Sequence, residues 1–98
     1  MGYSYHRSRT DDNQSEIIKA LRDLGAVVTD CSSLRKAFDL LVGYRGKLHI
    51  IEVKDGSKPK SQRKLTEGET KCKESFERVG VPYNVVESVE DAINLVCG

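Results

Sequence analysis

The stretch that decides the fold is residues 38–54, FDLLVGYRGKLHIIEVK. Two apolar runs rich in β-branched side chains, residues 38–44 and 47–54, are separated by Arg45-Gly46. This pattern of two strand-forming runs around a short glycine-containing turn predicts a β-hairpin. Because both faces of the hairpin are largely apolar, helices are expected to cover both sides of the sheet.

A two-residue turn sets which residues of the hairpin oppose each other. Leu41 then opposes Ile50, and Asp39 opposes Glu52. Since side chains alternate between the faces of a strand, Lys54 lies on the same face as the two carboxylates. The opposite face is expected to carry Phe38, Leu40, Val42, His49, Ile51 and Val53.

The flanking sequence predicts the rest of the domain from helical spacing, caps and β-prone runs. The expected elements are a helix from Asp12 or Asn13 to Leu24, a strand at 26–29, a helix at 66–79 opened by a Thr66-x-x-Glu69 capping box, a strand at 82–87, and a helix at 88–96 capped by Ser88. The order α-β-β-β-α-β-α predicts an α/β fold with a small mixed sheet and a central hairpin, flanked by helices on both faces. Ninety-eight residues form one domain, 1–98, with residues 1–10 expected as a flexible arm.

Composition narrows the functional class. No apolar run approaches the roughly 20 residues of a spanning helix, and the N-terminus lacks a secretory signal, so no membrane association is expected. Three widely spaced cysteines argue against a disulfide framework or zinc ribbon and favour the cytoplasm. The net charge of +1 hides a segment, residues 34–64, with nine Lys and Arg against three Asp and Glu. This asymmetry indicates a surface that faces a polyanion, although basic loops beside acidic helices would produce it too.

The opposed carboxylates Asp39 and Glu52 are an unfavourable pair in the predicted sheet. Like charges at directly opposed positions are destabilising, and such faults are expected at functional sites. A hard divalent cation, Mg²⁺ or Mn²⁺, would convert the repulsion into ligation. Lys54 could then orient an attacking water or stabilise developing negative charge. The alternative is a salt-bridged cluster of these three residues at an exposed sheet end.

The pattern Asp39…Glu52-x-Lys54 resembles the D-x(n)-E-x-K signature of the PD-(D/E)XK nuclease superfamily, whose members have a restriction-endonuclease-like core. The chain is more closely similar to stand-alone, phage-type VRR-NUC domains over nearly its whole length. The segments that carry this resemblance are 9–17, 20–26, 38–46, 51–56, 64–69 and 86–92. One residue departs from the pattern: Phe38 stands where proline usually precedes the Asp.

The resemblance implies a Mg²⁺-dependent endonuclease, acting as a homodimer on branched DNA such as Holliday junctions. By motif position it implies that Asp39 and Glu52 bind the metal with the backbone carbonyl of Val53, and that Lys54 assists the water. A phage-encoded protein of this kind would act in the host cytoplasm. The alternatives are a general duplex or single-strand DNA nuclease, a non-catalytic nucleic-acid-binding module, and a small interaction domain.

The first helix offers two further candidates for the catalytic site. Gln14 lies on the apolar stripe of this helix, and Glu16 lies well off the stripe. The resemblance of residues 21–25 to archaeal junction resolvases also places Gln14 where many superfamily members have a site Glu. Glu16 retains the carboxylate, but it also sits at the capping-box position after Asn13. Both residues remain candidates at this point.

Basic residues on either side of the catalytic segment are the candidates for binding DNA. Cationic side chains there would neutralise backbone phosphates and give salt-dependent, mostly sequence-independent binding. The candidates are Arg35, Lys36, Lys58, Lys60, Arg63 and Lys64, with Arg7 and Arg9 in the arm.

Overall fold

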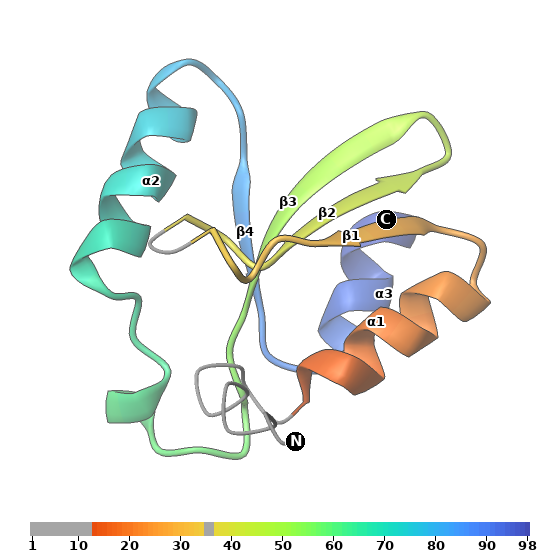
Figure 1. Ribbon diagram of the computed structural model, residues 1–98, viewed down its shortest axis with the longest axis horizontal. Coiled ribbons are helices and arrows are strands. Elements are labelled where there is room, and N and C mark those ends of the chain that lie inside the picture. The colour runs from red at the N-terminus through yellow and green to blue at the C-terminus, as the bar shows by residue number, and fades with distance from the viewer. Residues whose placement is uncertain (1–12, 35–36) are drawn as a thin grey trace.

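The computed structural model describes residues 13–34 and 37–98, and its element order is the predicted one. Figure 1 labels its three helices and four strands. They are α1 (Gln14–Asp23), β1 (Val27–Asp30), β2 (Leu40–Tyr44), β3 (Lys47–Val53), α2 (Glu67–Arg78), β4 (Tyr83–Val86) and α3 (Val89–Cys97), with a 3-10 turn at Lys60–Gln62. Within the described residues, no helix is long and apolar enough to cross a membrane.

The sheet is mixed, with the strand order β1-β2-β3-β4 and the hairpin at its centre. β1 and β2 pair antiparallel, as do β2 and β3, whereas β3 and β4 are parallel. Leu41 pairs with Ile50, which confirms the register predicted from the turn. Arg45 and Gly46 both have positive φ, 50° and 80°, as a two-residue turn with the twist of a hairpin requires.

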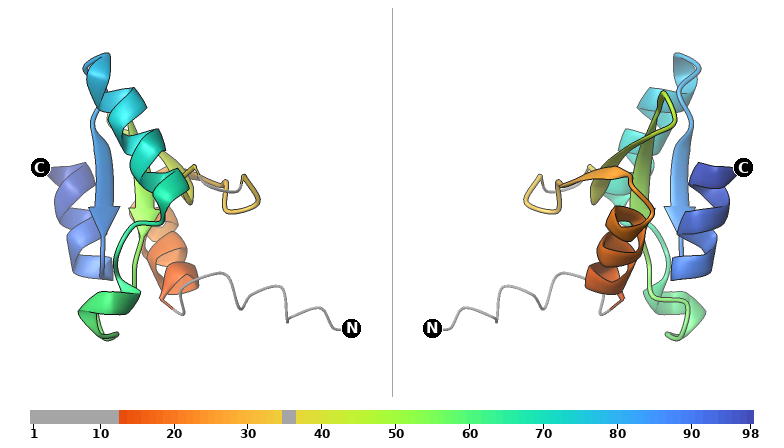
Figure 2. Two further views of the ribbon diagram at one scale, coloured as in Figure 1. Left: turned by 90° about the vertical axis from the view of Figure 1, so that its left-hand side faces the viewer. Right: turned by 90° about the vertical axis from the view of Figure 1, so that its right-hand side faces the viewer.

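The sheet separates two helical layers. α1 and α3 pack against each other on one face, and α2 lies on the opposite side (Figures 1 and 2). The main core lies on the α1–α3 face and contains Ile17, Leu21, Leu40, Val42, Ile51, Val53, Val86, Ala92 and Val96. This arrangement leaves the α2 face of the sheet free to carry polar side chains at one end.

The side-chain caps predicted from the sequence are present at two of the three helices. Thr66 and Glu69 form the predicted capping box of α2, and the Ser88 side chain caps α3. Asn13 occupies the N-cap position of α1 without a side-chain cap. Its Nδ2 instead donates to the carbonyls of Lys54, at 3.2 Å, and Glu87, at 3.1 Å. Asn13 therefore ties α1 to the ends of β3 and β4, and the predicted capping box with Glu16 is wrong.

The hairpin departs from its regular register at the open end. β2 begins at Leu40, and the Asp39 N–H donates at 3.1 Å to the carbonyl of Ile51, although Ile51 is the register partner of Leu40. The alternation of faces is broken there. Phe38 was expected on the core face with Leu40, but its ring packs edge-on against Phe76 of α2, with centroids 6.3 Å apart.

The three cysteines differ in their exposure. Cys31 is buried and Cys72 is half-buried, but Cys97, at the end of α3, is exposed. All three are free thiols, in agreement with the absence of a disulfide framework.

Candidate active site

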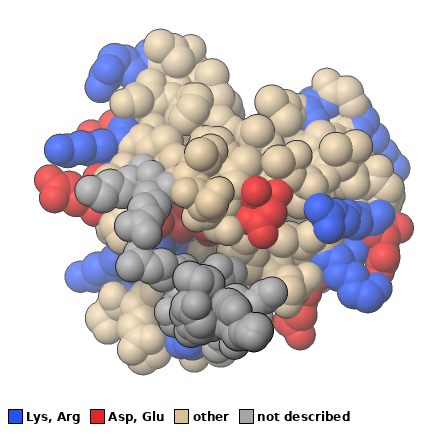
Figure 3. Space-filling view, in the orientation of Figure 1, with Lys and Arg blue, Asp and Glu red and all other residues tan. Residues whose placement is uncertain are grey.

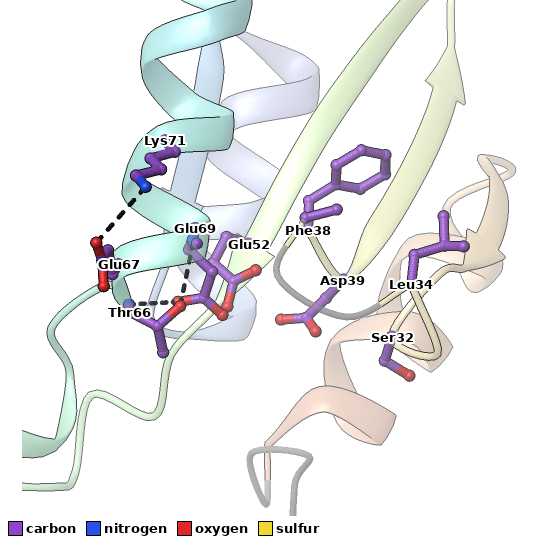
Figure 4. Close-up of a pocket in the computed structure, with 11 residues that line it drawn as sticks. Ser32, Leu34, Phe38, Asp39, Glu52, Thr66, Glu67, Glu69 and Lys71 are labelled. Atoms are coloured by element: carbon purple, nitrogen blue, oxygen red, sulfur yellow. Dashed lines mark hydrogen bonds and ion pairs between the residues drawn. The ribbon is translucent and has the colours of Figure 1, made fainter.

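A cavity of about 610 Å³ opens between the N-terminus of α2 and the segment that leads into β2. Figure 4 shows Asp39 on one side of this cavity, with Glu52 and Glu69 across from it and the carboxylates directed toward one another. The cavity is lined by Ser32, Leu34, Ala37, Phe38, Asp39, Glu52, Thr66, Glu67, Gly68, Glu69 and Lys71. The hairpin thus brings the two predicted carboxylates into one cavity, where α2 adds a third.

Asp39 is held by the backbone of the neighbouring strand. Its Oδ2 accepts a hydrogen bond from the N–H of Val53 at 2.9 Å. Burial raises the pKa of Asp39 above its usual value, and the hydrogen bond from Val53 opposes that shift. The side chain therefore sits at the boundary between the sheet end and the cavity, in a fixed orientation.

Glu52 is the most strongly perturbed carboxyl of the cavity. The residue is only 3% exposed. Burial, together with the nearby negative charge of Asp39, raises the pKa of Glu52 to about 9. Two desolvated carboxyls this close disfavour simultaneous ionisation, because each penalises the charge of the other. The repulsion between Asp39 and Glu52 that the sequence predicts is thus present. It is relieved because one proton stays bound to this pair of carboxyls.

Lys54 lies beside the pair and is itself almost fully buried, at 8% exposure. Its Nζ is 3.4 Å from Glu52 Oε2 and 3.0 Å from Glu69 Oε1. Burial by itself would lower the pKa of Lys54, but the Glu69 and Glu52 carboxylates outweigh it and raise the pKa. The lysine is therefore a charged, oriented ammonium within an acidic cluster.

Glu69 is the site residue that the sequence analysis missed. Its Oε1 accepts from Lys54 Nζ and also from the N–H of Thr66, at 2.9 Å. The signal was present in the Thr66-x-x-Glu69 capping box, which was interpreted only as a helix start. The Thr66 and Lys54 hydrogen bonds lower the pKa of Glu69 against the effect of burial, so this carboxyl carries the negative charge that pairs with Lys54.

α1 presents Gln14 to the interior and Glu16 to solvent. Gln14 is 1% exposed, and its Nε2 donates to Asp30 Oδ1 at 3.4 Å. Its Oε1 is buried with no hydrogen-bond partner among the described residues. Glu16 is exposed. Of the two candidates left open by the sequence, Gln14 is buried and Glu16 exposed, and neither is among the residues that line the cavity.

The described cations of the basic segment lie in different parts of the fold. Lys54 is in the acidic cluster, and Arg45 lies over the Tyr44 ring at the hairpin turn. Arg63, a candidate for DNA binding, donates to Glu87 at 2.9 Å. On the face shown in Figure 3, basic side chains lie in separate groups beside acidic ones.

The remaining candidates for DNA binding divide by their placement. Lys60 and Lys64 are exposed in the segment between β3 and α2, and Lys58 there is half-buried. The other four candidates, Arg7, Arg9, Arg35 and Lys36, lie outside the described residues.

The carboxyl groups of the cavity can be compared with the ligands that a divalent cation requires. In the described part of the chain, no group of three or more His, Cys, Asp or Glu residues is placed to hold a metal ion. A magnesium site does not need such a group, because Mg²⁺ usually binds one or two carboxylates and completes its shell with waters and substrate phosphates. Two adjacent, desolvated carboxyls that disfavour joint ionisation fit such a cation, since its charge would remove the penalty. The chemistry of Asp39 and Glu52 is therefore compatible with Mg²⁺ or Mn²⁺.

The chain is thus a small α/β domain, with a four-stranded mixed sheet between helices and a carboxylate cluster beside a lysine at one end of the sheet. Among solved structures, the chain matches one described as "VRR_NUC domain", at 26% sequence identity and a TM-score of 0.63. The match covers 86% of this chain and 94% of that chain. No protein-family model matches the chain, and no curated protein does.

The match supports the resemblance of the chain to VRR-NUC domains, and it confirms the predicted fold class. It supports a nuclease-family function.

Proposed function

We propose that this protein is a Mg²⁺-dependent, structure-selective endodeoxyribonuclease that hydrolyses phosphodiester bonds of branched DNA, such as Holliday junctions, as a homodimer. The observation that carries the proposal is that Asp39 and Glu52 line one open cavity, with Lys54 Nζ 3.4 Å from Glu52 Oε2. The similarity to a VRR_NUC domain supports the reaction class.

Asp39 and Glu52 are proposed to hold the metal, with the backbone carbonyl of Val53 as a third ligand. A bound Mg²⁺ supplies Lewis-acid polarisation of the phosphate and lowers the pKa of a bound water. Asp39 is pre-positioned for this task by the Val53 N–H, which fixes one carboxylate oxygen and leaves the other directed to the cavity. Manganese suits the same oxygen ligands and is expected to substitute.

Lys54 is proposed to orient the attacking water. Its ammonium has three donors, and the two carboxylates that it contacts in the described structure, Glu52 and Glu69, engage two of them. The third donor remains for a water or a phosphate oxygen. Because both carboxylates hold the ammonium from the side of the sheet and α2, the nitrogen is fixed in position before substrate binds.

Branched DNA and a homodimer are proposed together. A four-way junction has near two-fold symmetry, so paired cuts on opposing strands require two sites related in the same way, which an isologous dimer supplies. Lys60 and Lys64, both exposed beside α2, are proposed to contact the phosphate backbone, and Arg7, Arg9, Arg35 and Lys36 remain candidates for the same role.

The test compares labelled four-way junction, flap, nicked and linear DNA, each with Mg²⁺, Mn²⁺ or EDTA. Asp39→Asn and Lys54→Met are expected to reduce the cleavage rate about a hundredfold or more. The matched controls are Asp23→Asn and Lys47→Met, both at exposed positions distant from the cavity, and they should cleave as the wild type does. Light scattering on the free protein measures the oligomeric state.

Each outcome distinguishes among the functions considered. Equal cleavage by the wild type and both site variants would refute the assigned site. Cutting of linear DNA as fast as junctions would replace the proposal with a general nuclease. Junction binding in EDTA, without strand cutting in either metal, would indicate a non-catalytic binding module.

A further inference from the structure

The cavity has two chemically different walls. The acidic wall carries Glu52 and Glu69, whereas Leu34, Ala37 and Phe38 form an apolar wall. Figure 4 shows Leu34 on the side of Asp39, across from α2, with Phe38 between them and the helix. Leu34 is 55% exposed, so this wall is open to whatever occupies the cavity. An apolar wall beside carboxylates can contact an apolar or aromatic part of a bound ligand.

The central member of the wall, Phe38, is fixed by its neighbours. Phe76 packs its ring at 68° to that of Phe38, which supports the Phe38 side chain from α2. The preceding carbonyl, that of Ala37, accepts a hydrogen bond from the hydroxyl of Tyr83 at 2.7 Å, and Tyr83 is only 4% exposed. Phe38 is half-buried, so part of its ring remains available to the cavity. A pre-positioned aromatic ring loses little conformational entropy on binding a ligand.

We propose that Phe38, with Leu34 and Ala37, forms a stacking wall for one unpaired nucleobase of the DNA substrate, next to the carboxylates that act on its phosphate. The inference rests on the proposed nuclease function and adds the form of DNA at the cut. Unpaired bases are held by aromatic side chains, whereas paired bases are already stacked within the duplex. The cavity volume, about 610 Å³, is within the range of small-ligand sites and accommodates a nucleoside.

The test uses two DNA substrates that differ by one base. Each is a duplex with one unpaired nucleotide, which carries either a base or an abasic tetrahydrofuran. Wild-type protein is expected to cleave the base-bearing substrate about fivefold faster or more, because removing one base–aromatic stack has an effect of at least this size. Phe38→Leu retains apolar volume but removes the aromatic face, so the ratio should fall to near one. Phe76→Leu removes the ring that supports Phe38 but keeps the Phe38 ring itself, so it should reduce the preference less than Phe38→Leu does.

A second measurement keeps the inference independent of turnover. A single-stranded oligonucleotide with one 2-aminopurine, titrated with protein in EDTA, is expected to lose fluorescence with the wild type and not with Phe38→Leu. Circular dichroism checks that each variant is folded. An unchanged base-to-abasic ratio in Phe38→Leu, or no quenching by the wild type, would overturn the stacking wall. Failure of every substrate to be cut would refute the proposed function instead, and the quenching would still decide the inference.

Discussion

Replacing Glu52 with glutamine in the metal-free protein removes a carboxyl whose charge the fold opposes. Burial and the charge of Asp39 raise the pKa of Glu52 from 4.5 to about 9. The folded protein therefore keeps a proton on this carboxyl at a pH where the unfolded chain has lost it. Because Asp39 is coupled to Glu52, the titration belongs to the pair as a whole.

The sign of the effect follows from proton linkage. A group whose folded pKa is raised contributes stability that is fully present below the unfolded pKa and is lost as the pH rises toward the folded pKa. Between pH 4.5 and pH 7, about 2.5 pH units at about 1.4 kcal/mol per unit remove roughly 3 kcal/mol from the free energy of unfolding. The amide introduced by Glu52→Gln does not titrate, so the variant keeps the part of the free energy of unfolding that the wild type loses as the pH rises.

The assay is urea denaturation in EDTA at pH 4.5, 7 and 8.5. The stability of Glu52→Gln relative to wild type is expected to increase by about 3 kcal/mol from pH 4.5 to pH 7, and to increase further at pH 8.5. Glu16→Gln, at an exposed position, controls for the chemical change itself. A stability difference that stays constant with pH would refute the reasoning.

Adding Mg²⁺ extends the same experiment to the proposed metal site. A ligand that binds only the folded state raises its stability, and the increase grows with the logarithm of the ligand concentration once the site is largely filled. Millimolar Mg²⁺ at pH 7 is therefore expected to stabilise the wild type and to have little effect on Glu52→Gln. Equal stabilisation of both proteins would exclude Glu52 as a ligand.

Three further predictions follow from contacts around the site. Thr66→Ala removes the side-chain cap of α2 and should lower stability by about 1 kcal/mol in urea denaturation, whereas Thr66→Ser should not. Lys60→Gln and Lys64→Gln should each reduce the slope of log affinity for DNA against log salt by about 1 in fluorescence anisotropy, and an unchanged slope would remove that residue from the DNA surface. Asn13→Ala breaks two hydrogen bonds that hold α1 to the ends of β3 and β4, and should cost about 1–3 kcal/mol; hydrogen exchange that is unaltered in α1 would contradict this.

The sequence predicted the central hairpin well because its constraints are local. The Arg45-Gly46 turn fixes the register, and alternation then places Leu41 opposite Ile50 as observed. The predicted alternation of faces was wrong at the open end of the hairpin, which is far from the turn. There the contact of Phe38 with Phe76, two residues far apart in the chain, replaces strict alternation. Strand pairing close to a turn is therefore readable from sequence, whereas the last residues of a strand depend on tertiary packing.

The residues of the candidate site likewise divide into those predictable from local sequence and those brought in by tertiary packing. Asp39, Glu52 and Lys54 belong to one hairpin, so their proximity follows from strand geometry. Glu69 is brought in by α2, which packs on the sheet through contacts that no local pattern encodes. Charge summed along residues 34–64 does not show which cations form ion pairs within the fold, since Arg63 pairs with the distant Glu87.

A single oxygen atom, Glu69 Oε1, receives both the N–H that starts α2 and the ammonium of Lys54. The first turn of a helix opens more often than its middle, and each opening of this turn would remove one of the two carboxylates that hold the lysine. The local stability of one helix end thus sets how much of the time the ammonium is in place. Warming should reduce that fraction well before the core melts, so activity is expected to decline with temperature ahead of global unfolding.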